Sequence, residues 1–169
     1  FAILAEPSLP LAHRLALLAA LGQDLQHWMD AAPQQAAAEG CTETRLVADA
    51  ALALAEFYGD RTGWPGLIDR LTEAIPEADL SEFLVPLLEL LESLPPNHAH
   101  WPERLAALRK ALPHRLARPL WESPEQEQAA ANAAHYMLYR YFLPAARQGD
   151  ALCGPLHAIA AALLIPLLA

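Results

Sequence analysis

Apolar residues recur along this chain at the spacing of an α-helix, and this periodicity most restricts the folds open to it. Leu11, Leu15, Leu18, Leu25 and Trp28 are separated by four, three, seven and three residues, so they share one helix face. No window alternates apolar and polar residues over any length, and β-branched residues are scarce, so strands are not supported. We therefore predict an all-α protein, an irregular multi-helix bundle of about six to eight helices.

Capping residues, prolines and glycines divide the apolar stripes into successive helices. We predict a first helix with Ser8 as its cap and Pro10 in its first turn, closed by Pro33. The second helix is expected from about Thr44 to Tyr58, and Gly59 ends it.

Prolines also mark the next two helices. A short third helix is predicted to end at Pro76, and Pro95 and Pro96 are predicted to stop a fourth. Within the fourth helix Pro86 lacks a backbone N–H, so we expect a kink or a start point there. The apolar stripe of this helix is predicted to comprise Phe83, Leu84, Leu87, Leu91 and Leu94.

The second half of the chain has a clear helix start. We predict a fifth helix from Trp101 to Leu112, with an apolar stripe of Leu105, Leu108 and Leu112, followed by an irregular segment over residues 113–122. Ser123, Pro124 and Gln126 then supply an N-cap, a proline at the first helical position and an amide at the third. This order predicts that a helix begins at residue 124.

The two ends of the chain bear on its organisation. The last twelve residues, AIAAALLIPLLA, are wholly apolar, but a bilayer span needs about 20 such residues. We predict a buried or truncated core helix, with membrane contact as the alternative. The opening residues FAILAEPSLP lack a Met and the basic region of a signal peptide. We expect residues 1–169 to form a single helical domain that is a fragment of a longer protein.

Charge and cysteine content exclude several classes of function. Eleven basic residues stand against 20 acidic ones, giving a net charge of -9, which is the wrong sign for a nucleic-acid binder. Cys41 and Cys153 lie far apart and lack partners at metal-ligand spacing, so neither a metal cage nor a disulfide framework is indicated. A reducing, cytoplasmic location without nucleic-acid or membrane partners fits these features.

The common catalytic signatures are missing. The chain has no GxGxxG after a strand, no phosphate-binding loop, no GxSxG and no HExxH. His98 and His100 have a spacing that supplies two metal ligands only if a third arrives from elsewhere, and we predict no metal site. The sequence therefore assigns no catalytic residue and leaves open whether the chain is an enzyme.

Residues 132–150, NAAHYMLYRYFLPAARQGD, are the one stretch where aromatic, amide and guanidinium groups gather at helical spacing. Asn132, Tyr136, Tyr139 and Arg140 share one helix stripe. One interpretation is a central helix of the bundle, whose polar groups satisfy one another. The other is a binding groove, in which Arg140 grips a carboxylate and the tyrosines flank an alkylammonium group. These four residues are the candidate substrate-binding residues.

The other stripe of the same helix is assigned to the core. Tyr141 and Phe142 are the large groups expected to be buried there. Pro144 follows directly on this crowded stretch and is expected to end or bend the helix.

Two segments of the chain resemble a known family. An Asn, then an apolar and aromatic helix ending in an Arg-aromatic-Phe triplet, then Gly-Asp and a closing apolar helix resemble the C-terminal half of flagellin lysine N-methylases. The stretch SLPLAHRLALLAALG is similar to that family's apolar-x-x-Arg-Leu helix. Together these segments cover about a third of the chain. The matching residues are Asn132, Tyr136, Leu138, Tyr139, Arg140, Tyr141, Phe142, Gly149, Asp150 and the helix around Leu156 to Leu168, with Leu11, Arg14, Leu15 and Leu18 earlier.

The resemblance implies a protein-lysine N-methyltransferase. Complete members of the family transfer a methyl group from S-adenosylmethionine to lysine side chains of flagellin. They begin with a cysteine-rich region associated with an iron–sulfur cluster, and none of those cysteines occurs in this chain. The resemblance therefore implies no cofactor within this segment, and it names flagellin and the cysteine-rich region as partners.

Two alternatives from other classes stay open. The first is a helical ligand-sensing domain of a transcriptional regulator, which binds a small molecule in an apolar pocket between long helices. The second is a non-catalytic helical interaction module, which predicts a large exposed apolar patch and a stable complex with a partner.

Overall fold

The computed structural model describes residues 2–74, 80–95 and 99–168 of the chain. Within these ranges it contains seven α-helices, one short 3-10 turn and no strand, which confirms the prediction of an all-α multi-helix bundle. The elements are α1 (Leu11–Glu39), α2 (Glu43–Gly59), η1 (Arg61–Gly63), α3 (Trp64–Ala74), α4 (Leu80–Ser93), α5 (Trp101–Leu116), α6 (Pro124–Arg147) and α7 (Cys153–Leu168).

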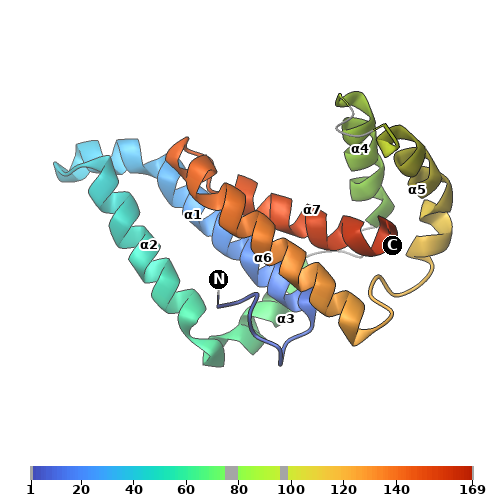
Figure 1. The fold of residues 1–169 in the computed structure, drawn as a ribbon. Helices are drawn as coiled ribbons and strands as arrows, with labels where there is room; N and C mark the ends of the chain where they lie inside the picture. Colours follow the sequence, from blue (N-terminus) through green and yellow to red (C-terminus); the bar gives the residue numbers. More distant parts are fainter. Residues whose placement is uncertain (1, 75–79, 96–98, 169) are drawn as a thin grey trace.

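Helices α1, α6 and α7 run side by side and form the centre of the fold (Figure 1). Helices α6 and α7 make the most extensive helix pair, joined by a short turn at Gly149, whose φ of 87° lies in the left-handed region. Alanines on the contacting faces let these helices approach closely. The first core cluster comprises Leu4, Leu11, Leu15, Leu18, Ala130, Ala131, Ala134, Leu138, Ala158 and Ala162.

Two glycines fix the approach of α7 to its neighbours. A Cβ added at Gly22 of α1 would lie 2.7 Å from Cγ of Pro155. A Cβ added at Gly154 of α7 would lie 2.7 Å from the Cα of Phe142 in α6. Because both distances are shorter than real Cβ contacts, α7 can sit this close to α1 and α6 only where glycine is present.

Helices α2 and α3 fold back beside α1 after the turn at Gly40, whose φ is 68°. The Tyr58 hydroxyl donates a 2.7 Å hydrogen bond to Asp24 of α1. The indole Nε1 of Trp64 donates a 3.0 Å hydrogen bond to the carbonyl of Tyr58. These bonds satisfy the polar ends of two buried aromatic side chains. The second core cluster comprises Ile3, Leu17, Tyr58, Trp64 and Ile68.

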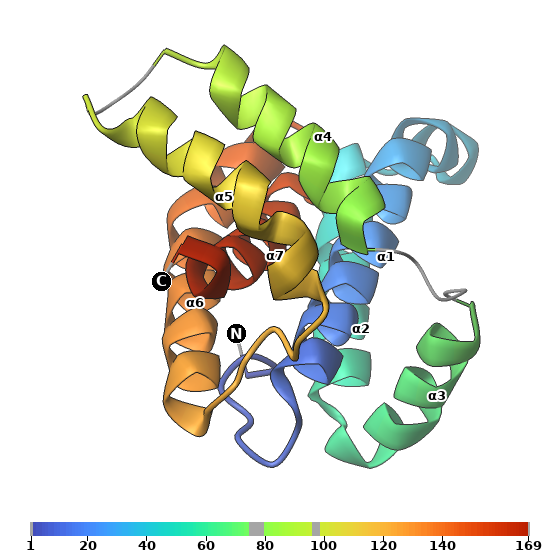
Figure 2. The same cartoon turned by 90° about the vertical axis from the view of Figure 1, so that its right-hand side faces the viewer.

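Helices α4 and α5 form a hairpin beside the C-terminal end of α7 (Figure 2). On the outer side of the hairpin, Arg109 of α5 pairs with Glu89 and Glu92 of α4 at 3.6 and 3.2 Å. The third core cluster comprises Leu84, Leu88, Leu105, Leu108, Leu112 and Leu167, which confirms the apolar stripe predicted for the fifth helix.

Several prolines at predicted helix boundaries lie inside helices, so they do not start or end them. Helix α1 continues through Pro33 to Glu39, and α4, α5 and α6 continue through Pro86, Pro113 and Pro144. All four proline side chains are exposed. The carbonyl group one turn earlier, which loses its N–H partner, therefore lies on the exposed side of the helix, where water can supply the missing bond. Pro76 and Pro96 lie outside the described residues.

The start of α1 also differs from the prediction. Ser8 does not cap the helix, because its hydroxyl donates to Glu6 at 2.7 Å, and Pro10 occupies the N-cap position. The cap comes instead from α6, where the Glu127 carboxylate accepts the Leu11 N–H at 2.6 Å. The Ser123 cap of α6 is confirmed, since its hydroxyl accepts the Gln126 N–H at 3.3 Å.

The prediction for α4 and α5 was wrong in two details. Helix α5 extends to Leu116, so only the second half of the segment 113–122 is irregular. On α4, Leu84 and Leu88 are buried, whereas Phe83 and Leu94 of the predicted stripe are exposed. The buried row is rotated because α4 packs on α5 and the end of α7 from one side.

The apolar C-terminal run forms a core helix, as predicted. It lies in α7, where Ala158 and Ala162 are fully buried. Across the part of the chain that the structure describes, every helix is too short or too polar to cross a bilayer.

Replacing Glu127 with Ala should destabilise the fold by about 2–3 kcal/mol, because it strips a buried guanidinium of its partner and α1 of its cap. The measurement is urea unfolding followed by circular dichroism. Asp49→Ala is the matched control, since the Arg45–Asp49 pair spans 3.7 Å between exposed side chains and contributes less than about 1 kcal/mol. An equal loss of unfolding free energy in the two variants would contradict the stabilising role of Glu127.

Gly154→Ala should lower the free energy of unfolding by about 1–3 kcal/mol, because the new methyl group meets the backbone of Phe142. Gly66→Ala in α3 is the control, since a Cβ there meets nothing within 4 Å. The control should be neutral or stabilise the helix by up to about 1 kcal/mol. Thermal unfolding of both variants is the measurement. A loss of stability in Gly154→Ala but not in Gly66→Ala shows that the effect comes from the contact with Phe142 and not from replacing any glycine.

Candidate functional site

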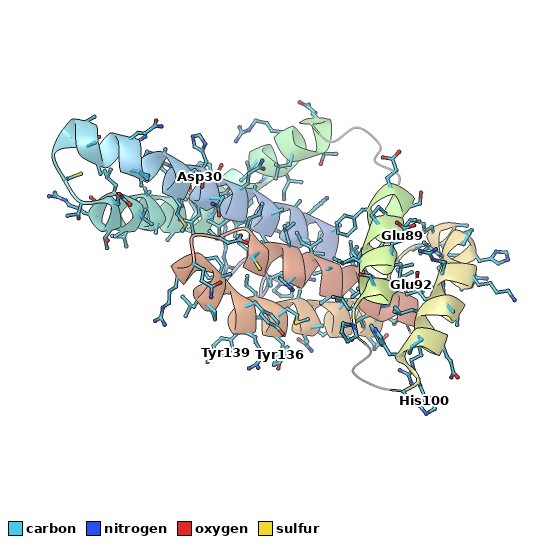
Figure 3. All side chains as sticks on the ribbon, turned by 90° about the horizontal axis from the view of Figure 1, so that it is seen from above. Asp30, Glu89, Glu92, His100, Tyr136 and Tyr139 are labelled. Atoms are coloured by element: carbon cyan, nitrogen blue, oxygen red, sulfur yellow. The ribbon has the colours of Figure 1, made fainter. Side chains whose placement is uncertain are left out.

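The four candidate residues lie together on the outer face of α6. Tyr136 and Tyr139 are 61% and 75% exposed, and Asn132 and Arg140 are exposed beside them. Figure 3 shows both tyrosines pointing away from the bundle on the same side of α6. On the opposite side of the helix Leu138 is buried, so the helical period separates a core face from a solvent face.

Helix α6 is central in the bundle, as the first interpretation predicted, but Asn132, Tyr136 and Arg140 lie on its exposed side and do not satisfy one another. Asn132 accepts a 2.9 Å hydrogen bond from Gln128 on its own helix, at an exposed position. Within the described residues, Arg140 pairs with no carboxylate. Since this face is open to water, its polar groups need no partner inside the protein.

The exposed side chains border a shallow groove of about 370 Å³ at the C-terminal half of α6. Two guanidinium groups face it, although the chain as a whole carries a net charge of -9. The groove is therefore a cationic and aromatic surface on an acidic protein. Its lining residues are Tyr136, Tyr139, Arg140, Leu143, Pro144 and Arg147.

This lining supports binding rather than bond-breaking chemistry. It contains no carboxylate, histidine or cysteine, so it offers no general base and no strong nucleophile. A guanidinium binds a carboxylate through two parallel hydrogen bonds, and tyrosine rings pack on aliphatic or cationic groups. The groove can therefore hold an extended side chain against the tyrosine rings and a nearby carboxylate of the same ligand against a guanidinium group.

The two aromatic residues assigned to the core behave differently. Phe142 is half-buried and packs against the first core cluster, as predicted. Tyr141 is 38% exposed, and its ring stacks on His157 of α7 with centroids 5.0 Å apart. The core assignment of Tyr141 was wrong because the small residues at the start of α7 leave the edge of the helix pair open to water.

A cysteine–histidine pair at the start of α7 was missed from the sequence. The Sγ of Cys153 lies 3.3 Å from Nδ1 of His157, which is also 2.8 Å from the carbonyl oxygen of Cys153. Burial and then the negative charge of Asp150 raise the pKa of the Cys153 thiol. The pair therefore consists of a neutral thiol beside an imidazole, unlike the activated thiolate of a cysteine enzyme. The spacing of four residues in CGPLH, once placed on a helix, could have revealed it.

The remaining candidates for metal binding do not converge. His100 is exposed and lies 3.5 Å from Glu103, while His98 lies outside the described residues. Among the residues whose positions are described, no three His, Cys, Asp or Glu side chains gather as metal ligands. The α6 groove is thus the surface with the most distinctive chemistry.

Comparison with protein-family models, with curated proteins and with solved structures found no match. The chemistry of the chain itself therefore bears on its function. Two features bear most directly on it, namely the exposed tyrosine and arginine face of α6 and the apolar interior beneath that helix.

Asp150→Asn should speed alkylation of Cys153 by iodoacetamide a few-fold at pH 7.5. Removing the negative charge lowers the pKa of the thiol, so a larger fraction is thiolate. The asparagine oxygen can still accept the Cys153 N–H, which Asp150 accepts at 2.8 Å. The alkylation rate is measured by peptide mass spectrometry in a Cys41→Ser background. An unchanged or slower rate would show that the charge of Asp150 does not raise the pKa of the Cys153 thiol.

Proposed function

We propose that this chain is the helical part of a flagellin lysine N-methylase-like protein, and that the outer face of α6 binds the flagellin segment that carries the target lysine. The observation that carries the proposal is the exposure of Tyr136 and Tyr139, beside Arg140, on the helix that resembles that family. The methyl group comes from S-adenosylmethionine bound by the complete protein.

The apolar part of the groove suits a protein ligand. Tyrosine and arginine are enriched at the energetic centres of binding surfaces, since each combines a large contact area with a polar end. Leu143 is 60% exposed and adds aliphatic surface next to the tyrosines. A lysine stem of four methylene groups can lie along these three side chains with its amine reaching beyond them.

The guanidinium groups favour the protonation state that methyl transfer needs. A lysine amine attacks a methyl group only when it is neutral and correctly oriented. Arg140 and Arg147 both line the groove, and a nearby positive charge disfavours a second one. Their effect is to lower the pKa of a lysine held between the tyrosines, while Arg140 can also bind a carboxylate of the same flagellin segment.

Neither the two cysteines nor the α6 groove of this chain fits the cofactors of the family. An iron–sulfur cluster takes about four cysteine thiolates, whereas this chain has only Cys41 and Cys153, and the latter thiol is neutral and paired with His157. The α6 groove also offers no carboxylate to the ribose hydroxyls or the ammonium group of S-adenosylmethionine. The iron–sulfur cluster therefore belongs to the cysteine-rich region of the family, and S-adenosylmethionine to a part of the complete protein other than the α6 groove.

A non-catalytic interaction module is the second candidate function. Phe83 and Leu90 are 44% and 56% exposed, and their spacing of seven residues places them on one face of α4, while Leu94, directly after the helix, is 50% exposed. This apolar face, like that of α6, favours contact with another protein. The module predicts a stable complex without methyl transfer, and the mass of the complete gene product in solution, measured with and without flagellin, tests for such a complex.

The test of the methylase proposal uses the complete gene product, methyl-labelled S-adenosylmethionine and flagellin. Label should enter flagellin lysines, and Tyr139→Ala should raise the KM for flagellin about 5- to 10-fold, as expected for a residue worth more than about 1 kcal/mol at an interface. Leu52→Ala on α2 is the control, since Leu52 is 70% exposed and does not line the α6 groove.

Two outcomes would overturn parts of the proposal. If no label enters lysine while flagellin from a methylating strain serves as a good substrate control, the methylase function fails. If label enters but Tyr139→Ala and Leu52→Ala have the same KM as the unmodified protein, the function stands and the α6 face is not the flagellin site.

A further inference from the structure

An apolar cavity of about 110 Å³ lies between the N-terminal segment and helices α1, α6 and α7. It sits where the first core cluster, through Leu18 and Leu138, meets the second, through Ile3. All nine side chains around it are hydrocarbon or glycine. The cavity is on the inner side of α6, away from Tyr136 and Tyr139.

The close contact between α1 and α7 explains why the cavity stays open. Gly22 and Pro155 both line it, and they already touch so closely that a single added carbon at Gly22 would overlap Pro155. The two helices therefore cannot move closer to fill the space. On the other side, Leu4 is held in place because its carbonyl accepts a 3.0 Å hydrogen bond from the buried guanidinium of Arg14.

The lining determines what the cavity can hold. A buried water needs two to four hydrogen-bond partners, which hydrocarbon side chains do not supply. An engineered cavity of about 150 Å³ lined by similar residues stays dry and takes up benzene or xenon. A charged or strongly polar molecule would lose its hydration without compensation. Leu21, Leu25 and Phe142 are only half-buried, so one side of the cavity reaches the surface and gives a ligand access.

We propose that this cavity is a binding site for a small uncharged apolar molecule, of the size of one aromatic ring or a short branched alkyl chain. The site goes beyond the proposed methylase function and does not depend on it, since it uses the inner face of α6 and the proposed flagellin contact uses the outer face.

Benzene is the probe for the test. Near-saturating benzene should raise the Tm of the unmodified chain by about 3–6 °C, as expected when the ligand concentration exceeds Kd about 10-fold. Leu25→Phe, which fills the cavity from its half-buried edge, should abolish the rise. Leu18→Ala, which enlarges the cavity, should keep or increase it. Leu52→Phe is the matched control, because this exposed position lies outside the cavity and should leave the rise unchanged.

Methyl NMR gives a second readout that does not depend on any variant. Benzene should shift the methyl resonances of Leu18 and Leu138, which line the cavity, and leave those of Leu84 and Leu88 in the third core cluster unchanged. The proposal is overturned if benzene leaves both the Tm and these resonances unchanged. It is also overturned if Leu25→Phe responds to benzene as fully as Leu52→Phe does.

Discussion

The buried guanidinium of Arg14 holds together three segments on which the rest of the structure depends. Its Nη1 donates to the Leu4 carbonyl and its Nη2 to the Glu127 carboxylate, each at 3.0 Å. The same carboxylate oxygen accepts the Leu11 N–H. Because a buried charge without a partner is very costly, the N-terminal segment, the start of α1 and the start of α6 have to assemble together. The apolar cavity and the orientation of α6 both follow from this assembly.

The contact between Glu127 and Arg14 is linked to which side chains of α6 are buried and which are exposed. Glu127 fixes the start of the helix against Arg14, and Ala130, Ala134 and Leu138 then follow on the buried side at helical spacing. Tyr136 and Tyr139 fall on the opposite side, since each residue advances the helix by about 100°. The two tyrosines are therefore exposed because the opposite side of α6 is the one that packs in the core.

The sequence was sufficient for features that depend on near neighbours. It predicted the buried row Leu105, Leu108 and Leu112 and the cap at Ser123, because helix periodicity and capping act within one or two turns. It also placed the four candidate site residues on one helix stripe. Only the structure shows that this stripe faces water, since that depends on which face of α6 meets α1 and α7.

Features decided by distant partners could not be predicted. Arg14 and Glu127 are 113 residues apart, and no local pattern marks them as a pair. Helices continued through exposed prolines because packing on the opposite face outweighs the loss of one hydrogen bond to a hydrated carbonyl. The buried row of α4 was misassigned because its leucines cover a wide arc of the helix, and the packing of α5 and α7 decides which part of that arc is buried.

On the proposed function, the charge of the chain and that of the groove act at different distances. A net charge of -9 attracts a lysine-bearing partner at ranges comparable to the Debye length of about 8 Å. At contact, Arg140 and Arg147 oppose the ammonium form of the same lysine and favour the neutral amine. An acidic protein with a local cationic groove thus draws in a charged lysine and binds it best without its proton. A groove lined by carboxylates would bind the lysine more tightly, but in the ammonium form that cannot accept a methyl group.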